Sequence, residues 1–149
     1  MLKKTGREAM PLVADEAGRL TFVCRFVRDQ APPPELDTVG KVVRFVSLIP
    51  YVSDAAVYEG RLHVWNTSDA FFATLWGDEE EHAVQLCNFL LAMGRDCFVV
   101  VGNGIPEGAT AYVLMVESGA GDALDTNYLI NPVTGRIFDA RDVHCPLKA

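Results

Sequence analysis

The clearest hydrophobic pattern in the chain has the period of an amphipathic helix. Between Asp78 and Met93, apolar side chains recur at intervals of three and four residues, at Ala83, Leu86, Cys87, Leu90 and Met93. This spacing places them on one face of a helix, and Val84 and Leu91 widen that face until most of the circumference is apolar. The pattern therefore predicts a helix over residues 78–93 that is buried on nearly all sides and ends at Gly94.

Short apolar stretches separated by turn residues follow this helix. Residues 97–101 form a continuous apolar run, which predicts a strand buried on both faces. Residues 102–108 are rich in glycine and predict a long loop. Further strands are predicted at 111–117, 128–130 and 136–138, with turns at 118–125 and 131–135. One helix followed by a series of hairpins predicts an α+β fold with a mostly antiparallel sheet.

The N-terminal half has a less regular pattern. Residues 1–18 are expected to form a loose tail, and residues 20–27 a strand, because the latter are rich in β-branched and aromatic side chains. Residues 41–49 are largely apolar and are followed by a proline, which favours an extended segment. Ser68 is expected to cap a short helix that ends at Gly77.

Composition limits the classes of protein that fit. The chain has 149 residues, 50% of them hydrophobic, which is enough for one domain with a buried core. Its net charge of −7 argues against a nucleic-acid partner, because phosphate binding needs clustered lysine and arginine. No apolar run approaches the roughly 20 residues of a membrane-spanning helix, and no apolar core of a secretion signal is present. We therefore expect a cytoplasmic protein without a membrane span.

The four cysteines are far apart and form no CxxC pair. In a chain without a secretion signal they are expected to be free thiols, and Cys24, Cys87 and Cys97 to be core residues. His144 and Cys145 are adjacent, which is not the spacing of zinc ligands. We expect neither a metal nor a cofactor.

Five strings, in order along the chain, resemble a known domain. They are RFVSLIPYV (44–52), TSDAFF (67–72), GDEEEHAVQLCNFLL (77–91), GNGIPEGATAYVL (102–114) and NPVTG (131–135). The chain is similar to the degenerate transglutaminase-like domain, a branch of the papain-like cysteine-peptidase fold, of a family of ciliary transition-zone proteins. The resemblance implies a central buried helix packed on a mostly antiparallel sheet. It also implies a transglutaminase-like domain at 41–149, truncated at its C-terminus, after a segment at 1–40 that is the tail of a C2 domain.

Active transglutaminase-like enzymes use a Cys, a His and an Asp. By the same resemblance, the Cys position falls at Glu79 or Glu80, the His position at Thr110 and the Asp position at Asn131. A carboxylate cannot replace the thiolate that acts as nucleophile in acyl transfer. The resemblance therefore implies an inactive enzyme that serves as a protein-interaction or scaffold module and supports cilium assembly.

Two other functions stay open from the sequence. The first is an active cysteine-dependent peptidase or transglutaminase that uses Cys87 or Cys145, with His82 or His144 as its base, although a buried thiol on an apolar helix face is expected to be inert. The second is a purely architectural domain that packs against its neighbours in the parent protein.

The replaced triad also marks a candidate binding cleft. Residues 78–81 give the helix an acidic first turn, which suits the helix dipole and is expected either to face solvent or to form the rim of the cleft. The resemblance implies partners among other ciliary transition-zone proteins or neighbouring domains of the parent protein, or a peptide in the vacant cleft. It implies a location at the cilium base, in the transition zone or basal body. The candidate rim residues are Asp78, Glu79, Glu80, Glu81, His82, Asn103, Ile105, Glu107, Thr110, Tyr112 and Asn131.

Overall fold

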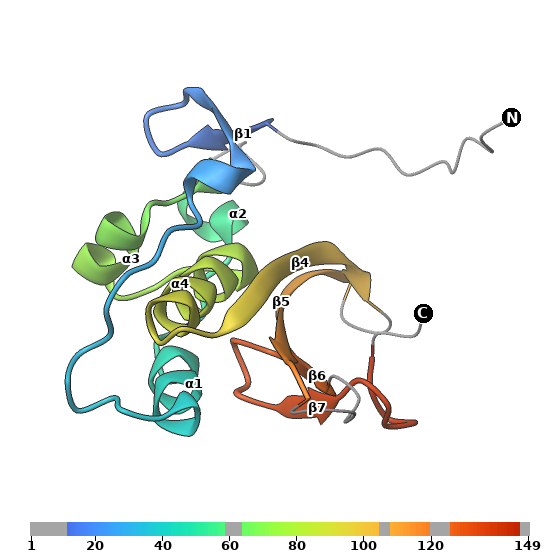
Figure 1. Ribbon diagram of the computed structural model, residues 1–149. Helices are drawn as coiled ribbons and strands as arrows, with labels where there is room; N and C mark the ends of the chain where they lie inside the picture. Colours follow the sequence, from blue (N-terminus) through green and yellow to red (C-terminus); the bar gives the residue numbers. More distant parts are fainter. Residues whose placement is uncertain (1–11, 59–63, 105–107, 120–125, 147–149) are drawn as a thin grey trace, which may run out of the picture.

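The fold is built around one helix. A computed structural model describes residues 12–58, 64–104, 108–119 and 126–146. In chain order, the elements are β1 (Leu12–Asp15), β2 (Leu20–Phe22), the 3-10 helix η1 (Val23–Arg25), α1 (Val39–Ser47), α2 (Asp54–Val57), β3 (Val64–Trp65), α3 (Ser68–Thr74), α4 (Glu79–Ala92), β4 (Asp96–Gly104), β5 (Gly108–Glu117), β6 (Thr126–Ile130) and β7 (Ile137–Asp139). Figure 1 shows α4 near the middle, with the β4–β7 sheet to its right, α3 to its left, α1 below and β1 above. The predicted α+β class is confirmed.

Helix α4 is buried on all sides from residue 80 to residue 90. Its first turn is closed by a reciprocal pair of hydrogen bonds. The Asp78 side chain accepts a bond from the N–H of Glu80, and the Glu81 side chain accepts one from the N–H of Asp78, which together form a capping box. At the other end, Gly94 has a φ of +74°, a conformation that glycine adopts without strain. The predicted helix, its burial and its terminal glycine are confirmed.

Strands β4 to β7 form an antiparallel sheet in sequence order. The sheet packs its inner face on α4, because one core cluster contains residues from both: Ala83, Leu86, Cys87, Leu90, Cys97, Ala111, Val113, Met115 and Ile130. The strands predicted at 111–117, 128–130 and 136–138 are confirmed. So is the turn at 131–135, where the N–H of Gly135 donates to the carbonyl of Asn131 at 2.9 Å.

Strand β4 differs from the prediction in two ways. It is an edge strand of the sheet, with Phe98 59% exposed and Val101 52% exposed, so the prediction of burial on both faces is wrong. A continuous apolar run does not distinguish an edge strand from a central one. The long loop predicted at 102–108 is also wrong, because β4 continues to Gly104, which pairs with Gly108 at the start of β5.

The extended segment predicted at 41–49 is wrong, because the chain forms helix α1 there. Thr38 caps this helix by accepting a hydrogen bond from the N–H of Lys41. Val42, Val43 and Val46 are buried in the core cluster that includes α4. Valine disfavours a helix by roughly half a kcal/mol relative to alanine, whereas burying a valine side chain contributes about 1.5 kcal/mol or more. Packing on α4 therefore outweighs the local preference.

The N-terminal segment packs on the same core as the rest of the chain. The strand predicted at 20–27 ends at Phe22 and a 3-10 turn follows. Strand β1 lies within the residues expected to form a tail, where it pairs with β2 and with β3. Two short elements, α2 and β3, have no signal in the hydrophobic pattern. The division of the chain at residue 40 stays a prediction.

Asn88 of α4 ties the N-terminal segment to the core. Its Oδ1 accepts a hydrogen bond from the N–H of Arg28 at 2.8 Å, and its Nδ2 donates to the carbonyl of Phe26 at 3.2 Å and to Ser68 Oγ at 2.8 Å. Asn88 is fully buried, so losing these partners would leave unpaired polar groups inside the protein. One side chain therefore joins α4, α3 and the residues before α1.

Helix α3 begins and ends one or two residues away from the predicted positions. Its cap is Thr67, which accepts a hydrogen bond from the N–H of Ala70, whereas Ser68 is buried against Asn88. The helix ends at Thr74 and is capped by Leu75, whose φ is +54°; it does not extend to Gly77. Gly77 instead packs closely against the ring of Phe71, so a side chain at position 77 would not fit.

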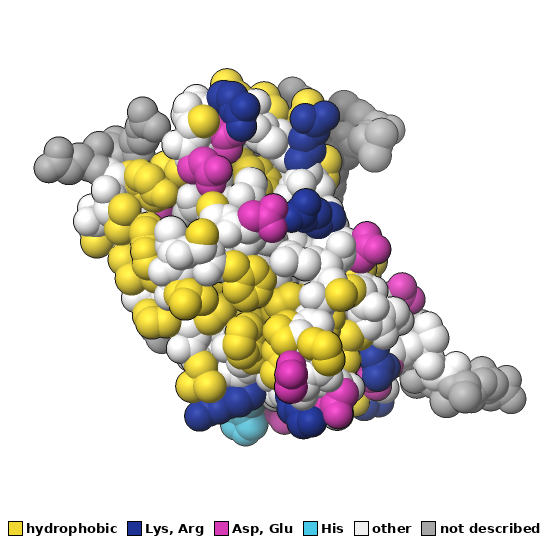
Figure 2. Space-filling view, turned by 90° about the vertical axis from the view of Figure 1, so that its left-hand side faces the viewer, with side chains coloured by type: hydrophobic (Ala, Val, Ile, Leu, Met, Phe, Trp, Pro, Cys, Tyr) yellow, Lys and Arg dark blue, Asp and Glu magenta, His cyan; other side chains and the backbone are white. Residues whose placement is uncertain are grey.

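Hydrophobic side chains gather on the side of the molecule that carries α1 and α3 (Figure 2). Leu48, which follows α1, is 61% exposed, and Leu75 is 56% exposed. Phe45 and Phe72 are half-buried, with ring centroids 6.5 Å apart. Exposed apolar area is thus present both at α1 and α3 and at the edge strand β4.

Replacing Gly77 with alanine is expected to destabilise the fold. A Cβ there would lie 2.7 Å from a ring carbon of Phe71 and 2.9 Å from the Cβ of Glu81, and overpacking costs about 1–3 kcal/mol. Gly40 in α1 is the matched control, because a Cβ there meets nothing within 4 Å. Gly40→Ala should stabilise the protein by roughly 0.5–1 kcal/mol through helix propensity. Unfolding in urea measures both, and equal effects of the two substitutions would contradict the packing described for Gly77.

Candidate functional site

The three positions of the replaced triad line one cavity. Glu79 is the first residue of α4, Thr110 lies on β5 and Asn131 follows β6. They line a cavity of about 210 Å³ together with Tyr51, Val133 and Thr134. The side-chain oxygen of Asn131 accepts hydrogen bonds from the N–H groups of Val133 and Thr134, at 3.1 and 3.0 Å, and so fixes the turn that forms one wall. The structure thus brings together the three residues that the sequence assigned to one site.

Tyr51 belongs to this site, although no motif in the sequence marks it. Its hydroxyl donates to Glu79 Oε1 at 3.2 Å. Tyr51 is 48% exposed, so its desolvation is only partial. This partial desolvation, followed by the charge of Glu79, raises the pKa of Tyr51 to about 12, and the phenol keeps its proton at neutral pH. Backbone contacts place it, because Gly77 bonds with both Pro50 and Val52 beside it. This backbone pairing of Tyr51 with Gly77 joins residues far apart in the sequence, so no periodic pattern of side chains predicts it.

A second cavity shares the Tyr51–Glu79 pair with the first. Its volume is about 150 Å³, and both cavities are lined by Tyr51 and Glu79. The other residues of the second cavity are Ser53, Asp54, Ala55, Asp78, Glu80 and Ala109. Acidic side chains line the two cavities, and none of the described lining residues is a lysine or an arginine. The pair of cavities therefore suits a ligand with a positive charge better than one with a negative charge.

The acidic first turn does not lie on a solvated face, which is one of the two positions that the sequence leaves open for it. Asp78, Glu80 and Glu81 are buried, and only Glu79 is partly exposed. Both Glu81 oxygens accept backbone hydrogen bonds, Oε1 from Asn66 and Oε2 from Asp78, each at 2.9 Å. The expectation that these acids face solvent is therefore wrong, because the capping box and the backbone of Asn66, which follows β3, hold Asp78 and Glu81 inside the protein.

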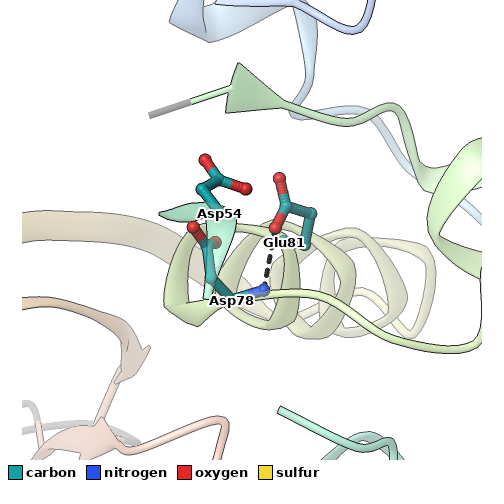
Figure 3. Close-up of side chains that lie close together, drawn as sticks. All are labelled: Asp54, Asp78 and Glu81. Atoms are coloured by element: carbon teal, nitrogen blue, oxygen red, sulfur yellow. Dashed lines mark hydrogen bonds between the residues drawn. The ribbon is translucent and has the colours of Figure 1, made fainter. Parts of the chain in front are cut away.

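Asp54, Asp78 and Glu81 point toward one another at the start of α4 (Figure 3). One carboxylate oxygen from each lies within 4.8 Å of the others, which is the spacing of a possible cation site. Each of the three also accepts a backbone hydrogen bond, Asp54 from Val64 at 2.6 Å and the other two within the capping box. These bonds give the cluster a structural role in joining α2, β3 and α4.

Protons stabilise this crowded group of carboxyl groups. Burial, followed by the adjacent Asp78 side chain, raises the pKa of Glu81 to about 9. The same two causes raise the pKa of Glu80 to about 8. Glu81 is thus protonated at neutral pH, which lowers the repulsion between neighbouring carboxylates.

The remaining candidate rim residues are dispersed. His82 is fully buried, with Nδ1 2.6 Å from the carbonyl of Asp78 and Nε2 3.0 Å from that of Ile49, so it joins α4 to the end of α1 and lines neither cavity. Tyr112 is buried on the opposite face of the sheet, in a cluster with Leu129 and Cys145. Asn103 is exposed on β4. Ile105 and Glu107 lie outside the described residues.

All four cysteines lie in the described part of the chain, and all are free. Cys87 is fully buried, 3.5 Å from the sulfur of Cys97, and its hydrogen bond with Cys97, together with burial, raises the pKa of its thiol. Cys145 is buried under the outer face of the sheet. Cys24 is exposed in η1, so its predicted core position is wrong. None of these thiols lines either cavity.

In the described ranges, no helix is both long enough and apolar enough to cross a membrane.

Comparisons with known proteins agree with the resemblance noted in the sequence. The family model of the CEP76 peptidase-like domain matches residues 63–149. Human Protein CC2D2B is 33% identical over 153 residues, covering 96% of this chain and 10% of that protein. Coiled-coil and C2 domain-containing protein 2A of Drosophila melanogaster is 26% identical over 153 residues, covering 99% of this chain and 11% of that protein. Human Centrosomal protein of 76 kDa is 35% identical over 97 residues, covering 62% of this chain and 15% of that protein. The chain thus spans about a tenth of the length of the first two relatives.

The free energy of unfolding is expected to fall as the pH rises from about 5 to about 9. In the unfolded chain Glu81 ionises near its usual pKa of 4.5, whereas the folded protein keeps the proton up to about pH 9. The folded state therefore binds more protons in this range, and stability decreases by at most about 1.4 kcal/mol per pH unit for each such group. Urea unfolding at pH 5, 6, 7, 8 and 9 measures the slope.

Glu81→Gln should flatten this dependence, because the amide cannot titrate. Glu35→Gln is the control, since Glu35 is exposed. Glu80 would account for the slope that remains, because its pKa is raised to about 8. A native protein whose stability is constant or rises between pH 5 and 8 would show that these carboxyl groups are ionised in the folded state.

Proposed function

This chain belongs to the family of CEP76 peptidase-like domains, and from that premise we propose that it is a catalytically inactive, transglutaminase-like domain that acts as a protein-interaction module. The observation that carries the proposal is the cavity lined by Glu79, Thr110 and Asn131. These three residues occupy the positions that the resemblance assigns to the Cys, His and Asp of an active enzyme. The cavity keeps the location of an active site, while its side chains lack the chemistry.

Acyl transfer of the cysteine type needs a thiolate, a base within hydrogen-bond reach and a group that orients the base. At the start of α4 stands Glu79, a carboxylate that already accepts a hydrogen bond from Tyr51. Asn131 uses its side-chain oxygen to hold its own turn. The alternative nucleophiles, Cys87 and Cys145, are buried in the core and under the outer face of the sheet. The arrangement supports recognition of a ligand without a covalent step.

The proposed ligand is a segment of a protein that carries a basic residue. Two cavities share the Tyr51–Glu79 pair, and Glu79 is the acid of the first turn that reaches solvent. A lysine or arginine side chain in either cavity would meet this carboxylate and could lie against the Tyr51 ring.

We further infer that the domain works at the base of the cilium. Two of the relatives carry names that describe their content or place: coiled-coil and C2 domains in the Drosophila melanogaster protein, and the centrosome in the human protein of 76 kDa. The resemblance of the sequence to ciliary transition-zone proteins adds the transition zone or basal body as its location. Other transition-zone proteins, or neighbouring domains of a longer parent protein, are the proposed partners in a scaffold that supports cilium assembly.

Thiol reactivity tests the absence of catalysis. In the native protein a thiol-reactive dye at neutral pH should label Cys24 rapidly, because it is exposed, and should label Cys87, Cys97 and Cys145 only after unfolding in urea. No hydrolysis or amine transfer should be detected with glutamine-containing peptides. The proposal fails if either activity is present and is abolished by Cys87→Ser or Cys145→Ser.

Substituting Glu79 tests binding in the cleft. Peptides selected from a display library against the folded chain should be rich in lysine or arginine and should shift the amide NMR signals of Glu79, Thr110 and Asn131. Glu79→Lys should weaken their binding at least about tenfold, because it places like charges together. Glu35→Lys is the matched control, with the same change of charge at an exposed residue that lines neither cavity.

Glu80→Lys would not be informative, because Glu80 is buried and the substitution would disturb the fold. If Glu79→Lys and Glu35→Lys bind the selected peptides equally, or if the shifted signals lie elsewhere, the cleft is not the binding site. A purely architectural domain would then be the better description.

A further inference from the structure

One edge of strand β4 faces away from β5. The sheet order is β4-β5-β6-β7, and within the described ranges no strand pairs with the side of β4 that faces away from β5. In an antiparallel ladder, alternate residues direct their N–H and C=O groups away from the partner strand. With respect to the residues that the structure describes, strand β4 therefore presents a row of backbone donors and acceptors that no other strand pairs.

Strand β4 also lacks the features that usually protect an edge. Its nine residues, DCFVVVGNG, include no lysine, arginine or proline. Its register with β5 runs without a bulge from Asp96 opposite Val116 to Gly104 opposite Gly108. Natural proteins commonly use such charges, prolines or bulges to prevent edge pairing. Their absence from a long apolar edge strand leaves it open to a further strand.

Exposed apolar side chains lie on both faces of this edge. Cys97 and Val99 face α4, so Val101 lies on the inner face, and Phe98 lies on the outer face. The outer row of paired residues consists of Phe98, Leu114, Leu129 and Phe138. Along that row Leu129 is buried and Leu114 is half-buried, whereas Phe98, where the sheet stops, is 59% exposed.

We propose that the β4 edge is a self-association surface, on which β4 of a second copy of this chain pairs antiparallel across a two-fold axis. A helix or a loop docked on one face could cover Phe98 or Val101, but only a strand in the plane of the sheet covers both. Two four-stranded sheets would then join into one continuous sheet. This interaction is separate from the cleft and goes beyond the proposed function.

The charge distribution of β4 favours a second copy in the antiparallel direction. Asp96, at the first position, is the only charged residue of the strand. A parallel pair in register would place the two Asp96 side chains opposite each other, which is unfavourable. An antiparallel pair places each Asp96 opposite the uncharged half of the other strand.

Sedimentation velocity of the full chain over a range of protein concentrations tests this proposal. We expect a reversible monomer–dimer equilibrium at physiological salt. Phe98→Lys and Val101→Lys should each raise the dissociation constant of the dimer at least about tenfold, which corresponds to about 1.4 kcal/mol. Leu48→Lys and Leu75→Lys are matched controls, because these leucines are as exposed (61% and 56%) but lie at the ends of α1 and α3.

Hydrogen exchange gives a second measurement that does not need a variant to fold. Amides of residues 97–103 that point away from β5 should become more protected as the protein concentration rises, while those that pair with β5 should not change. A chain that stays monomeric at all concentrations would overturn the proposal. So would a dimer that is lost in Leu48→Lys or Leu75→Lys and kept in Phe98→Lys and Val101→Lys.

Discussion

The structure depends on the burial of one helix on all of its sides. A helix with apolar residues round its circumference can be covered from every direction, but α4 also carries polar side chains in its buried part. Each of them needs a partner inside the protein, because an unpaired buried polar group is costly. His82 forms a hydrogen bond with the end of α1, and Glu81 forms one with the residue after β3. Asn88 forms hydrogen bonds with the N-terminal segment and with α3. The hydrogen bonds of α4 thus position the layers that surround it.

The same constraint shapes the candidate site. Asp78, Glu80 and Glu81 are buried in the first turn, where the capping box and the backbone N–H of Asn66 bond to Asp78 and Glu81. Glu79 stays at the surface and accepts a hydrogen bond from Tyr51. A helix N-terminus is where the dipole would stabilise a thiolate in an enzyme, and here it lies beside carboxyl groups. Some of these are neutral at physiological pH. The negative charge available to a ligand is therefore smaller than the run of four acids in the sequence indicates.

Parts of this structure can be predicted from the sequence because a local pattern encodes them. Helix α4 and the turn at Asn131 are such cases, since one repeats every three to four residues and the other uses the chemistry of an Asn side chain. The position of the cleft came from the resemblance of ordered strings. The sequence does not predict helix α1, because its three buried valines favour a strand locally and adopt a helical conformation only through their packing in the core. The exposure of β4 and the role of Tyr51 depend on which segments meet in space, and the position of Glu81 depends on a backbone donor from Asn66, the residue after β3. No period in the sequence records these contacts.

The end of α3 has a consequence for how the protein opens locally. Leu75 has a left-handed backbone with φ +54°, which costs a residue with a Cβ roughly 1–2 kcal/mol, and its side chain is mostly exposed. Relaxing that residue releases the strain and breaks the hydrogen bond from its N–H to the carbonyl of Phe71. The last turn of α3 is therefore a place where fraying costs less than in α4, whose termini are capped and whose sides are buried. Fluctuations of the native state should begin there and leave the cavity at the start of α4 intact.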